Sequence, residues 1–266
     1  MLSPLLPDES VYFGDYHCLG VLGEGGLGTV YVAHRDSRPE DLIALRVPRT
    51  WDRISSRRFS AEAEAIRRAH GRYFPELIKA EINGDPPWLA MALIHGLSIS
   101  DLLRECKPFP ESSIWRIGYE LSSALSLLKE ENILHRDITP MSVLLTRSGL
   151  MLSNFDMVRF TDVSADESEF RVAMGTFNYA APEQVLFTLH EAGRSGAALD
   201  TFGLGATLLY TATGHPPRSG RSYGERADAA RNEDADLSGL ESGPLRELIS
   251  ACLLRDPAAD RRSARS

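Results

Sequence analysis

The sequence predicts an α+β protein in which a small sheet with one helix precedes a larger helical part. Apolar runs with strand-like patterns lie before residue 95, in residues 16–35, 41–49 and 87–94. Helical patterns dominate after residue 95, and one of them, in residues 200–214, is apolar on nearly every side. We therefore expect a β-rich part followed by a helical part that is built around one buried helix.

The β-rich part is expected to start with a hairpin. Residues 16–35 carry apolar side chains on both sides of a glycine cluster, which suits two strands joined by a tight connection. Residues 55–70 combine strong helix formers with apolar residues at helical spacing, so one helix should follow the strand at residues 41–49. The strand expected at residues 87–94 completes this part.

The helical part should contain two long helices and two irregular stretches. Residues 112–131 have an amphipathic pattern, and residues 200–214 suit a central buried helix. The polar residues 156–174 and 215–236 interrupt these patterns and are expected to be poor in regular structure. The second stretch is either a docking surface for a partner or a long connection without a binding role.

Composition limits the classes of protein that remain. With 266 residues, 43% of them apolar, the chain can bury the core of one large or two modest domains. The net charge of -8 argues against nucleic acid or an anionic membrane as the main partner. No apolar stretch reaches the roughly 18 residues of a membrane span, and the amino terminus lacks the pattern of a signal peptide. Three widely spaced cysteines suit reduced thiols in a cytoplasmic protein.

A loop in the helical part carries the first chemical motif. His135, Arg136 and Asp137, with a strand pattern shortly after them, resemble the catalytic loop H-R-D-L-x-x-x-N of protein kinases. Five further segments match that family in its order. They are IALRV in the third-strand position, FSAEA in helix C, NFD in the place of D-F-G, GTFNYAAPE at the end of the activation segment, and LDTFGLGATL in the buried helix.

The resemblance runs from Tyr16 to Ala264 and is to the bacterial serine/threonine kinases of the eukaryotic type. It implies a two-lobed protein kinase fold with a β-rich N-lobe that contains helix C and a larger α-helical C-lobe. The implied boundaries are an N-terminal extension at residues 1–15, an N-lobe at residues 16–94 and a C-lobe at residues 95–264. It also implies ATP or another adenine nucleotide as a ligand, with Mg²⁺ as its usual companion.

The implied nucleotide site keeps its apolar and glycine positions. Glycines leave room for backbone N–H groups to approach phosphate oxygens, and apolar side chains can enclose an adenine ring. The residues that the resemblance assigns to nucleotide binding are Gly23, Gly25, Gly26, Gly28, Val30, Ala44, Arg46, Glu62, Met91, Leu93, Ile94, Ser98, Leu144 and Asn154.

Four positions that carry charge or metal in the family have changed. Arg46 replaces the third-strand lysine, and Thr139 replaces the lysine that follows the catalytic aspartate. Ser142 replaces the metal-binding asparagine, and Asn154 replaces the metal-binding aspartate of D-F-G. Because hard divalent cations prefer carboxylate oxygens, these changes weaken the case for Mg²⁺. Several such losses in one site should bring phosphoryl transfer close to background.

Arg46 and Asp137 each have two interpretations. Arg46 either contacts phosphate or forms an ion pair with Glu62 that holds helix C inward, and we favour the ion pair. Asp137 is the family's base-like residue and either orients an attacking hydroxyl or hydrogen-bonds Thr176 and the loop backbone. With the metal ligands altered, we favour the second role for Asp137.

Asp156 stands where the family has glycine, at a position that often adopts unusual backbone angles, which aspartate tolerates better than most residues. Residues two apart in an extended segment face the same side, so Asp156 is also a candidate to take over the metal from Asn154. The candidate metal ligands are therefore Asn154, Ser142 and Asp156. Whether Asp156 is a turn residue or a relocated ligand stays open.

Two further features of the implied C-lobe are a candidate buried ion pair and a loop with candidate phosphorylation sites. Glu183 and Arg261 lie near the positions of the family's buried ion pair, although the segment before Arg261 is one residue longer than usual. The loop after Asn154 offers Thr161 and two serines, Ser164 and Ser168, for phosphorylation. Four acidic residues around them favour a solvated acidic loop over a phosphorylation switch.

Three functions follow from these observations. The first is a pseudokinase that acts as a regulatory switch or scaffold through protein partners, with weak or metal-independent nucleotide binding. The alternative is an active or unconventional ATP-dependent serine/threonine protein kinase with altered metal binding. Asp137 and the glycine loop favour this alternative. A pure interaction module without a nucleotide site is the third, and the glycine loop argues against it.

Overall fold

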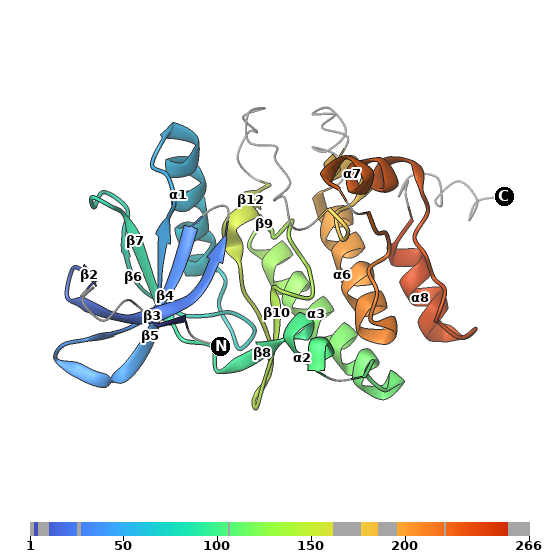
Figure 1. Ribbon diagram of the computed structural model, residues 1–266, viewed down its shortest axis with the longest axis horizontal. Coiled ribbons are helices and arrows are strands. Elements are labelled where there is room, and N and C mark those ends of the chain that lie inside the picture. The colour runs from blue at the N-terminus through green and yellow to red at the C-terminus, as the bar shows by residue number, and fades with distance from the viewer. Residues whose placement is uncertain are drawn as a thin grey trace. The chain divides into compact units, whose positions relative to one another are not determined.

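The computed structural model describes residues 3–4, 11–25, 28–105, 107–161, 177–185, 196–220 and 222–254. The chain forms two compact units. Unit 1 consists of Met1–His95 and Phe155–Val158, and unit 2 of Gly96–Asn154 and Arg159–Ser266. The large sheet lies in unit 1, and the described helices other than α1 and the short η1 lie in unit 2, so the predicted α+β class is confirmed (Figure 1).

Unit 1 is built on one antiparallel sheet with the strand order β1-β3-β4-β5-β7-β6 and with β2 paired to β3. The hairpin expected around the glycine cluster is present as β3 and β4, whose register pairs Gly25 with Gly28. The strands of this sheet are β1 (Ser3–Pro4), β2 (Tyr12–Phe13), β3 (Tyr16–Gly25), β4 (Gly28–Arg35), β5 (Arg38–Pro48), β6 (Leu77–Glu81) and β7 (Trp88–Ala92).

Strand alternation gives the sheet two different faces. One face carries the hydrophobic core of the unit, in which the Tyr16 ring meets the Trp88 ring edge to face at 5.4 Å and Leu45 is fully buried. The other face carries Arg46 and Ala44, because neighbours of Leu45 in the strand must point the opposite way. The candidate nucleotide residues of unit 1 therefore lie on the face away from this core.

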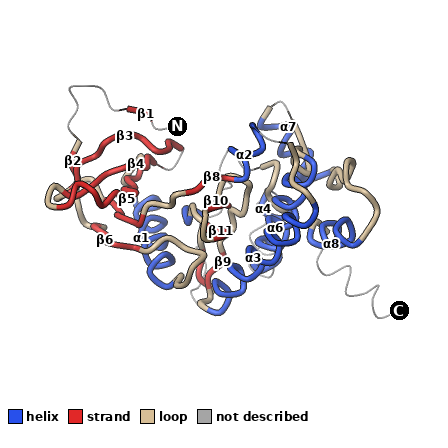
Figure 2. The backbone as a smooth tube through the Cα atoms, turned by 90° about the horizontal axis from the view of Figure 1, so that it is seen from below, coloured by secondary structure: helices blue, strands red, loops and turns tan. Residues whose placement is uncertain are grey.

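The predicted helix of unit 1 is α1 (Arg53–Arg68) (Figure 2). Its buried residues Phe59, Glu62, Ala63 and Ile66 recur at intervals of three and four, so they form one stripe along the helix. Glu62 is thus a carboxylate in the middle of an apolar stripe. Burial of an unpaired charge is very unfavourable, so this position requires a cationic partner.

Unit 2 is mainly helical. Its described helices are α2 (Ile99–Glu105), α3 (Glu111–Glu130), α4 (Pro182–Val185), α6 (Gly196–Thr213), α7 (Tyr223–Asn232) and α8 (Pro244–Cys252). The two long predicted helices are confirmed as α3 and α6, and α6 packs against both α3 and α8 (Figure 1). Leu199, Phe202 and Leu209 of α6 are buried, in agreement with its apolar pattern. Among the described helices, none has the length and apolar character needed to cross a membrane.

Two small sheets border the loop that holds the H-R-D motif. One sheet has the order β11-β10-β8, and the other pairs β12 with β9. Their strands are β8 (Gly96–Ser98), β9 (Ile133–Leu134), β10 (Val143–Thr146), β11 (Gly149–Leu152) and β12 (Arg159–Phe160). Because β9 ends at Leu134 and β10 begins at Val143, both ends of the loop between them are fixed by strand pairing.

One expectation about irregular structure was wrong. Residues 215–236 contain the helix α7, which a polar sequence can form because its first turn is capped. The Ser222 side chain accepts from the Glu225 N–H while the Glu225 side chain accepts from the Ser222 N–H, a capping box. Of residues 156–174, the described part contains the short helix η1 (Phe155–Met157) and β12.

The loop between β9 and β10 depends on a glycine of α6. A Cβ atom on Gly203 would lie 2.7 Å from Ile138 Cβ and 2.8 Å from the Ile138 carbonyl oxygen. The replacement Gly203→Ala should therefore push the loop away from α6 and lower the free energy of unfolding by about 1–3 kcal/mol. Urea denaturation of the full chain measures this change.

The matched control is Gly224→Ala in α7, where the nearest atom to a new Cβ is Ser222 Oγ at 4.0 Å. That variant should be neutral or more stable by about 0.5–1 kcal/mol, because alanine is the better helix former. Equal effects of the two variants would contradict close packing of α6 against the loop.

Candidate functional site

The register of unit 1 places four of the expected nucleotide residues on one face of the sheet. Val30 pairs with Arg46 across β4 and β5, and Ala44 pairs with Met91 across β5 and β7. Directly paired residues point to the same side, as do residues two apart in a strand. Val30, Ala44, Arg46 and Met91 therefore share a face. A flat apolar ring that lies on this face would contact Val30, Ala44 and Met91.

The glycines lie at the turn of the hairpin. Gly23 and Gly25 end β3, and a Cβ atom on either would meet nothing within 4 Å, so a ligand can approach their backbone. Gly28 begins β4 with φ +155°, and its Cβ would lie 2.3 Å from the Val47 carbonyl oxygen, so only glycine fits there. Gly26 lies outside the described residues.

The remaining apolar positions are divided between the units. Leu93 and Ile94 are half-buried in the segment after β7. In unit 2, Leu144 pairs with Ser98 across β10 and β8. The Ser98 hydroxyl donates to Asp101 Oδ2 at 2.6 Å and accepts from the Asp101 N–H at 3.0 Å, so it caps α2. Ser98 thus has a clear structural role, and its contact with a nucleotide stays a prediction.

The cationic partner of Glu62 is Arg46, as the favoured interpretation expected. Arg46 Nε lies 2.7 Å from Glu62 Oε1 and 2.8 Å from Oε2. A second carboxylate also contacts this arginine, because Arg46 Nη2 lies 2.6 Å from Asp156 Oδ1. Only 9%, 4% and 12% of the three side chains are exposed, in the order Arg46, Glu62, Asp156. We call this group the Arg46 triad.

The triad gives Asp156 an ion-pair role that the sequence did not suggest, while its role as a metal ligand stays a prediction. The segment is not extended, since Phe155–Met157 form the 3₁₀ turn η1, so the spacing that would align Asp156 with Asn154 does not apply. The unusual backbone angle is also not at Asp156, because the left-handed residue is Asn154, with φ +68°. In unit 1 Asp156 is an ion-pair partner of Arg46, with Phe155 beside it packed edge to face on Phe74.

Two buried carboxylates against one cation leave an excess of negative charge. Burial raises the pKa of Glu62 to about 8, with a further contribution from the charge of Asp156, while Arg46 opposes the shift. Burial likewise raises the pKa of Asp156 above its ordinary value, and Arg46 again opposes this. Glu62 and Asp156 therefore tend to share one proton near neutral pH. With one proton shared, their remaining negative charge balances the single positive charge of Arg46.

In unit 2, Asp200 holds the H-R-D loop through two hydrogen bonds. Its Oδ2 accepts from the His135 N–H at 2.9 Å and its Oδ1 from the Arg136 N–H at 2.6 Å. His135 is fully buried, and burial lowers its pKa to about 4, so the ring is neutral. Its Nε2 contacts the Ser153 carbonyl at 3.0 Å and its Nδ1 accepts from the Asp137 N–H, which places the proton on Nε2.

The two hydroxyl replacements, Thr139 and Ser142, serve the loop backbone. Ser142 Oγ donates to the Asp137 carbonyl at 2.9 Å and accepts from the Thr139 N–H at 3.0 Å. The Ser142 N–H in turn lies 3.3 Å from Thr139 Oγ1. Both hydroxyls are almost fully buried. This arrangement closes the turn from Asp137 to Ser142 with internal hydrogen bonds.

The carboxylate of Asp137 is hydrogen-bonded to the residue that replaces the metal-binding aspartate. Asn154 Nδ2 donates to Asp137 Oδ2 at 2.8 Å. A carboxylate can only accept, so the amide must present its nitrogen. Here one carboxylate, one amide and one hydroxyl stand where the family's Mg²⁺ site would need several charged oxygens. Across the described residues no group of three or more His, Cys, Asp or Glu side chains is arranged for a metal ion.

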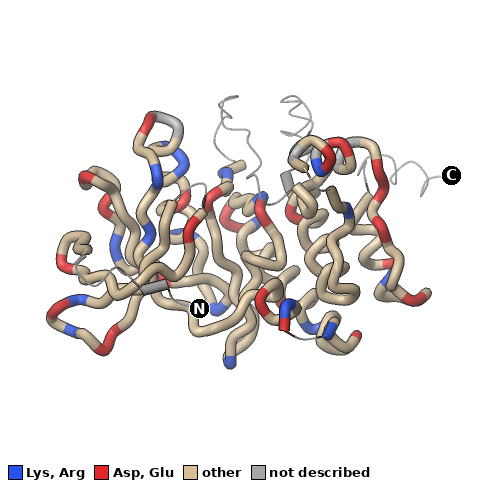
Figure 3. The backbone as a smooth tube through the Cα atoms, viewed as in Figure 1, with Lys and Arg blue, Asp and Glu red and all other residues tan. Residues whose placement is uncertain are grey.

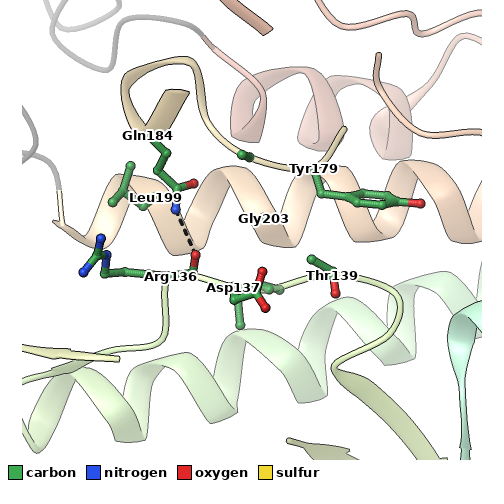
Figure 4. A pocket seen from close by; sticks show the side chains of 9 residues that line it. Arg136, Asp137, Thr139, Tyr179, Gln184, Leu199 and Gly203 are labelled. Atoms are coloured by element: carbon green, nitrogen blue, oxygen red, sulfur yellow. Dashed lines mark hydrogen bonds between the residues drawn. The ribbon is translucent and has the colours of Figure 1, made fainter. Parts of the chain in front are cut away.

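A small pocket borders Asp137 within unit 2. Figure 4 shows Arg136, Asp137 and Thr139 on one side of it and Tyr179 and Gln184 on the other, with α6 behind. Gln184 Nε2 donates to the Arg136 carbonyl at 2.8 Å, and Gln184 Oε1 accepts from the Ala181 N–H. These two hydrogen bonds fix the Gln184 side chain, which lines the pocket together with Asp137.

Several sequence expectations are only partly covered by the structure. Ile66 and Phe155 are buried and Ala80 is half-buried in unit 1, and His135 is buried in unit 2. Thr161 Oγ1 lies 3.2 Å from Asn132 Oδ1. The following residues lie outside the described parts or have no described side chain: Ser164, Ser168, Thr176, Glu183 and Arg261.

Two contacts were missed at the level of sequence, although a signal for each was present. Arginine at position 46 has more donors than lysine, and a new carboxylate at position 156 accompanies it. Asn154 likewise appears together with a retained Asp137, and an amide can donate to a carboxylate where an aspartate cannot. The signal was a pair of complementary substitutions for Arg46 and Asp156, and one substitution opposite a retained carboxylate for Asn154 and Asp137.

The Arg46 triad makes stability depend on pH. The pKa of Glu62 is raised on folding, so the folded state keeps a proton that the unfolded chain releases above about 4.5, and the resulting stabilisation is lost as the pH rises through about 8. Replacement of Asp156 by asparagine removes one cause of this shift. The free energy of unfolding of the wild type should decrease between about pH 4.5 and 8. In Asp156→Asn this decrease should be smaller by on the order of 1 kcal/mol.

Urea denaturation at a series of pH values checks this expectation. The control is Glu64→Gln on the same helix, because the Glu64 carboxylate is partly exposed and paired with Arg68, a contact that lowers its pKa. It should leave the decrease toward high pH unchanged. An identical pH profile for wild type and Asp156→Asn would contradict the shared proton.

Comparison with known proteins agrees with the motifs and the fold. The family model described as protein kinase domain matches residues 16–266. Serine/threonine-protein kinase AfsK of Streptomyces griseus is 32% identical over 267 residues, a match that covers 98% of this chain and 32% of the relative. Probable serine/threonine-protein kinase PkwA of Thermomonospora curvata is 30% identical over 258 residues, which are 97% of this chain and 34% of the relative.

A third relative is more distant. Serine/threonine-protein kinase PknF of Mycobacterium tuberculosis is 29% identical over 221 residues, or 79% of this chain and 45% of the relative. The chain thus spans about a third of the length of AfsK and PkwA and less than half of PknF. With its two-unit α+β fold, its H-R-D loop held by Asp200 and these matches, the chain belongs to the protein kinase superfamily, among relatives of the bacterial serine/threonine type.

Proposed function

We propose that the chain is a regulatory protein kinase-like domain that binds an adenine nucleotide weakly or without metal and transfers little or no phosphate. The observation that carries this proposal is that the charged side chains of the candidate site form ion pairs or hydrogen bonds with other side chains of the same chain. Arg46 contacts Glu62 and Asp156, and Asp137 accepts from Asn154. We also propose the lobe boundaries of the resemblance, residues 16–94 and 95–264.

The physical basis is the nature of phosphoryl transfer. The protein contributes positions and charges that stabilise the transferring group, with little covalent chemistry of its own. Loss of one preorganised electrostatic group costs about 10²- to 10³-fold in rate. Thr139, Ser142 and Asn154 bring no charge to their positions, and the charge of Arg46 is already balanced. These features support a switch or scaffold better than an efficient catalyst.

Nucleotide binding is supported by the parts that remain intact. The glycines at the β3–β4 turn leave their backbone accessible, and Val30, Ala44 and Met91 share one face of the sheet. An adenine ring needs an apolar surface more than it needs charge. An interaction module without any nucleotide site would have no use for this combination.

A second candidate is an active ATP-dependent serine/threonine protein kinase with altered metal binding. The three relatives are named serine/threonine-protein kinases, and this family normally uses ATP. Asp137 is also retained and lines a small pocket of unit 2. The comparisons taken alone favour this candidate, whereas the contacts of Arg46 and Asn154 favour the first.

Protein partners and a cytoplasmic location are further parts of the proposal. The connection between α7 and α8 carries exposed acidic side chains at Glu233, Asp234, Asp236 and Glu241. Figure 3 shows acidic positions along this connection in red. Such a segment suits a basic surface on a partner protein. Cys18 and Cys252 are free thiols, which agrees with a reducing compartment.

Transfer of labelled γ-phosphate from ATP distinguishes the two candidates. The full chain is incubated with Mg²⁺ or Mn²⁺, alone and with a generic serine/threonine peptide, beside an Asp137→Ala variant. We expect label incorporation by the wild type to equal that of the variant, because the charges that stabilise the transferring group are absent or balanced. Incorporation that disappears in Asp137→Ala would overturn the proposal and establish the second candidate.

Restoration of a carboxylate tests the loss of the metal site. Asn154→Asp would place a second carboxylate beside Asp137 Oδ2, where the amide now donates at 2.8 Å. Two adjacent carboxylates attract a divalent cation, so Mn²⁺ should bind at least about tenfold more tightly than to the wild type. Titration with Mn²⁺, followed by electron paramagnetic resonance, measures the free ion.

The matched control is Asn132→Asp, since Asn132 is also a left-handed asparagine but is exposed at a turn. It should leave Mn²⁺ binding at the wild-type level. Equal gains in both variants would mean that the extra negative charge alone, and not a second ligand beside Asp137, causes the binding.

A further inference from the structure

Arg46 is the cation that the register places on the nucleotide face of unit 1, next to Val30 and two residues from Ala44. In the kinase resemblance this position carries the lysine that reaches the phosphates. Here Arg46 Nε lies between the two oxygens of Glu62, and Arg46 Nη2 lies 2.6 Å from Asp156. The cation that should receive phosphate is thus already engaged by two carboxylates.

The two carboxylates contact Arg46 Nε and Nη2, so a phosphate could bind these two nitrogens only by displacing a carboxylate. Glu62 is 4% exposed and Asp156 12%, so a displaced carboxylate would stay buried without its cation. An uncompensated buried charge is strongly unfavourable, because neither water nor a partner stabilises it. If no carboxylate moves, the phosphate meets a site with at least as much negative as positive charge.

The adenine end of a ligand meets no such obstacle. Val30, Ala44 and Met91 are apolar and lie on the same face, and their contacts depend on shape and not on charge. A nucleoside therefore keeps its favourable contacts, while each added phosphate adds a repulsive term that Mg²⁺ would normally remove.

We propose that Asp156 is a specificity-determining residue that shifts ligand preference from nucleoside triphosphates to adenine nucleosides with few or no phosphates. Asp156 does so by engaging Arg46 from a position where the family has glycine. This inference rests on the proposed nucleotide binding, and it states which chemical class of nucleotide the site takes.

Isothermal titration of the full chain tests the order of affinities. Adenosine, AMP, ADP and ATP are compared at constant ionic strength in the presence of EDTA, and then with Mg²⁺. In the wild type we expect adenosine to bind at least as tightly as ATP in both conditions. Affinity should fall with each added phosphate in EDTA.

Removal of the carboxylate should restore affinity for phosphate. One unit charge a few ångströms away, partly screened, changes binding of a phosphate chain by about tenfold or more. Asp156→Asn and Asp156→Gly should therefore bind ATP about tenfold more tightly than the wild type, with adenosine affinity changed by less than about twofold. Circular dichroism confirms that each variant is folded.

The control is Asp41→Asn, which removes the same charge from unit 1 at an exposed ion pair with Arg38. It should leave the ratio of ATP to adenosine affinity unchanged. If both Asp156 variants fail to fold, the wild-type series alone decides. Tighter binding of ATP than of adenosine in EDTA overturns this inference and leaves the nucleotide site intact, whereas no binding of any ligand overturns the nucleotide site itself.

Discussion

The buried Arg46 triad is the interaction on which the rest of the structure depends. It joins β5 through Arg46, α1 through Glu62 and η1 through Asp156. Residues Phe155–Val158 belong to unit 1, although Asn154 and Arg159 on either side belong to unit 2. An ion pair with little exposure is a strong reason for this short segment to stay with unit 1, because its separation would leave charges buried without partners.

In unit 2 a carboxylate also finds its partner within the chain, and that partner is a neutral amide. Asn154 donates to Asp137, and the hydroxyls of Thr139 and Ser142 bond the backbone of the loop. In each unit, groups that would need a ligand to be satisfied find a partner within the chain. The fold of a protein kinase domain can therefore persist here without the metal and phosphate charges that usually complete such a site. Internal neutralisation of this kind supports the regulatory role that we propose.

The fold was largely accessible from sequence because its patterns are strong. Apolar periodicity and glycine placement predicted the β3–β4 hairpin, α1, α3 and α6. The helix α7 was missed because its sequence is polar and its stability depends on a local capping box. The role of Asp156 was missed because spacing alone cannot tell an extended segment from a 3₁₀ turn, and the turn decides where the carboxylate points.

A double-mutant cycle between Arg46 and Asp156 tests the central claim most directly. Free energies of unfolding are measured for the wild type, Arg46→Met, Asp156→Asn and the double variant at one neutral pH. We expect a coupling energy of about 2 kcal/mol, with Asp156→Asn destabilising the wild type but not the Arg46→Met protein. Effects that add to within about 0.3 kcal/mol would show that the two residues are energetically independent and would contradict the account.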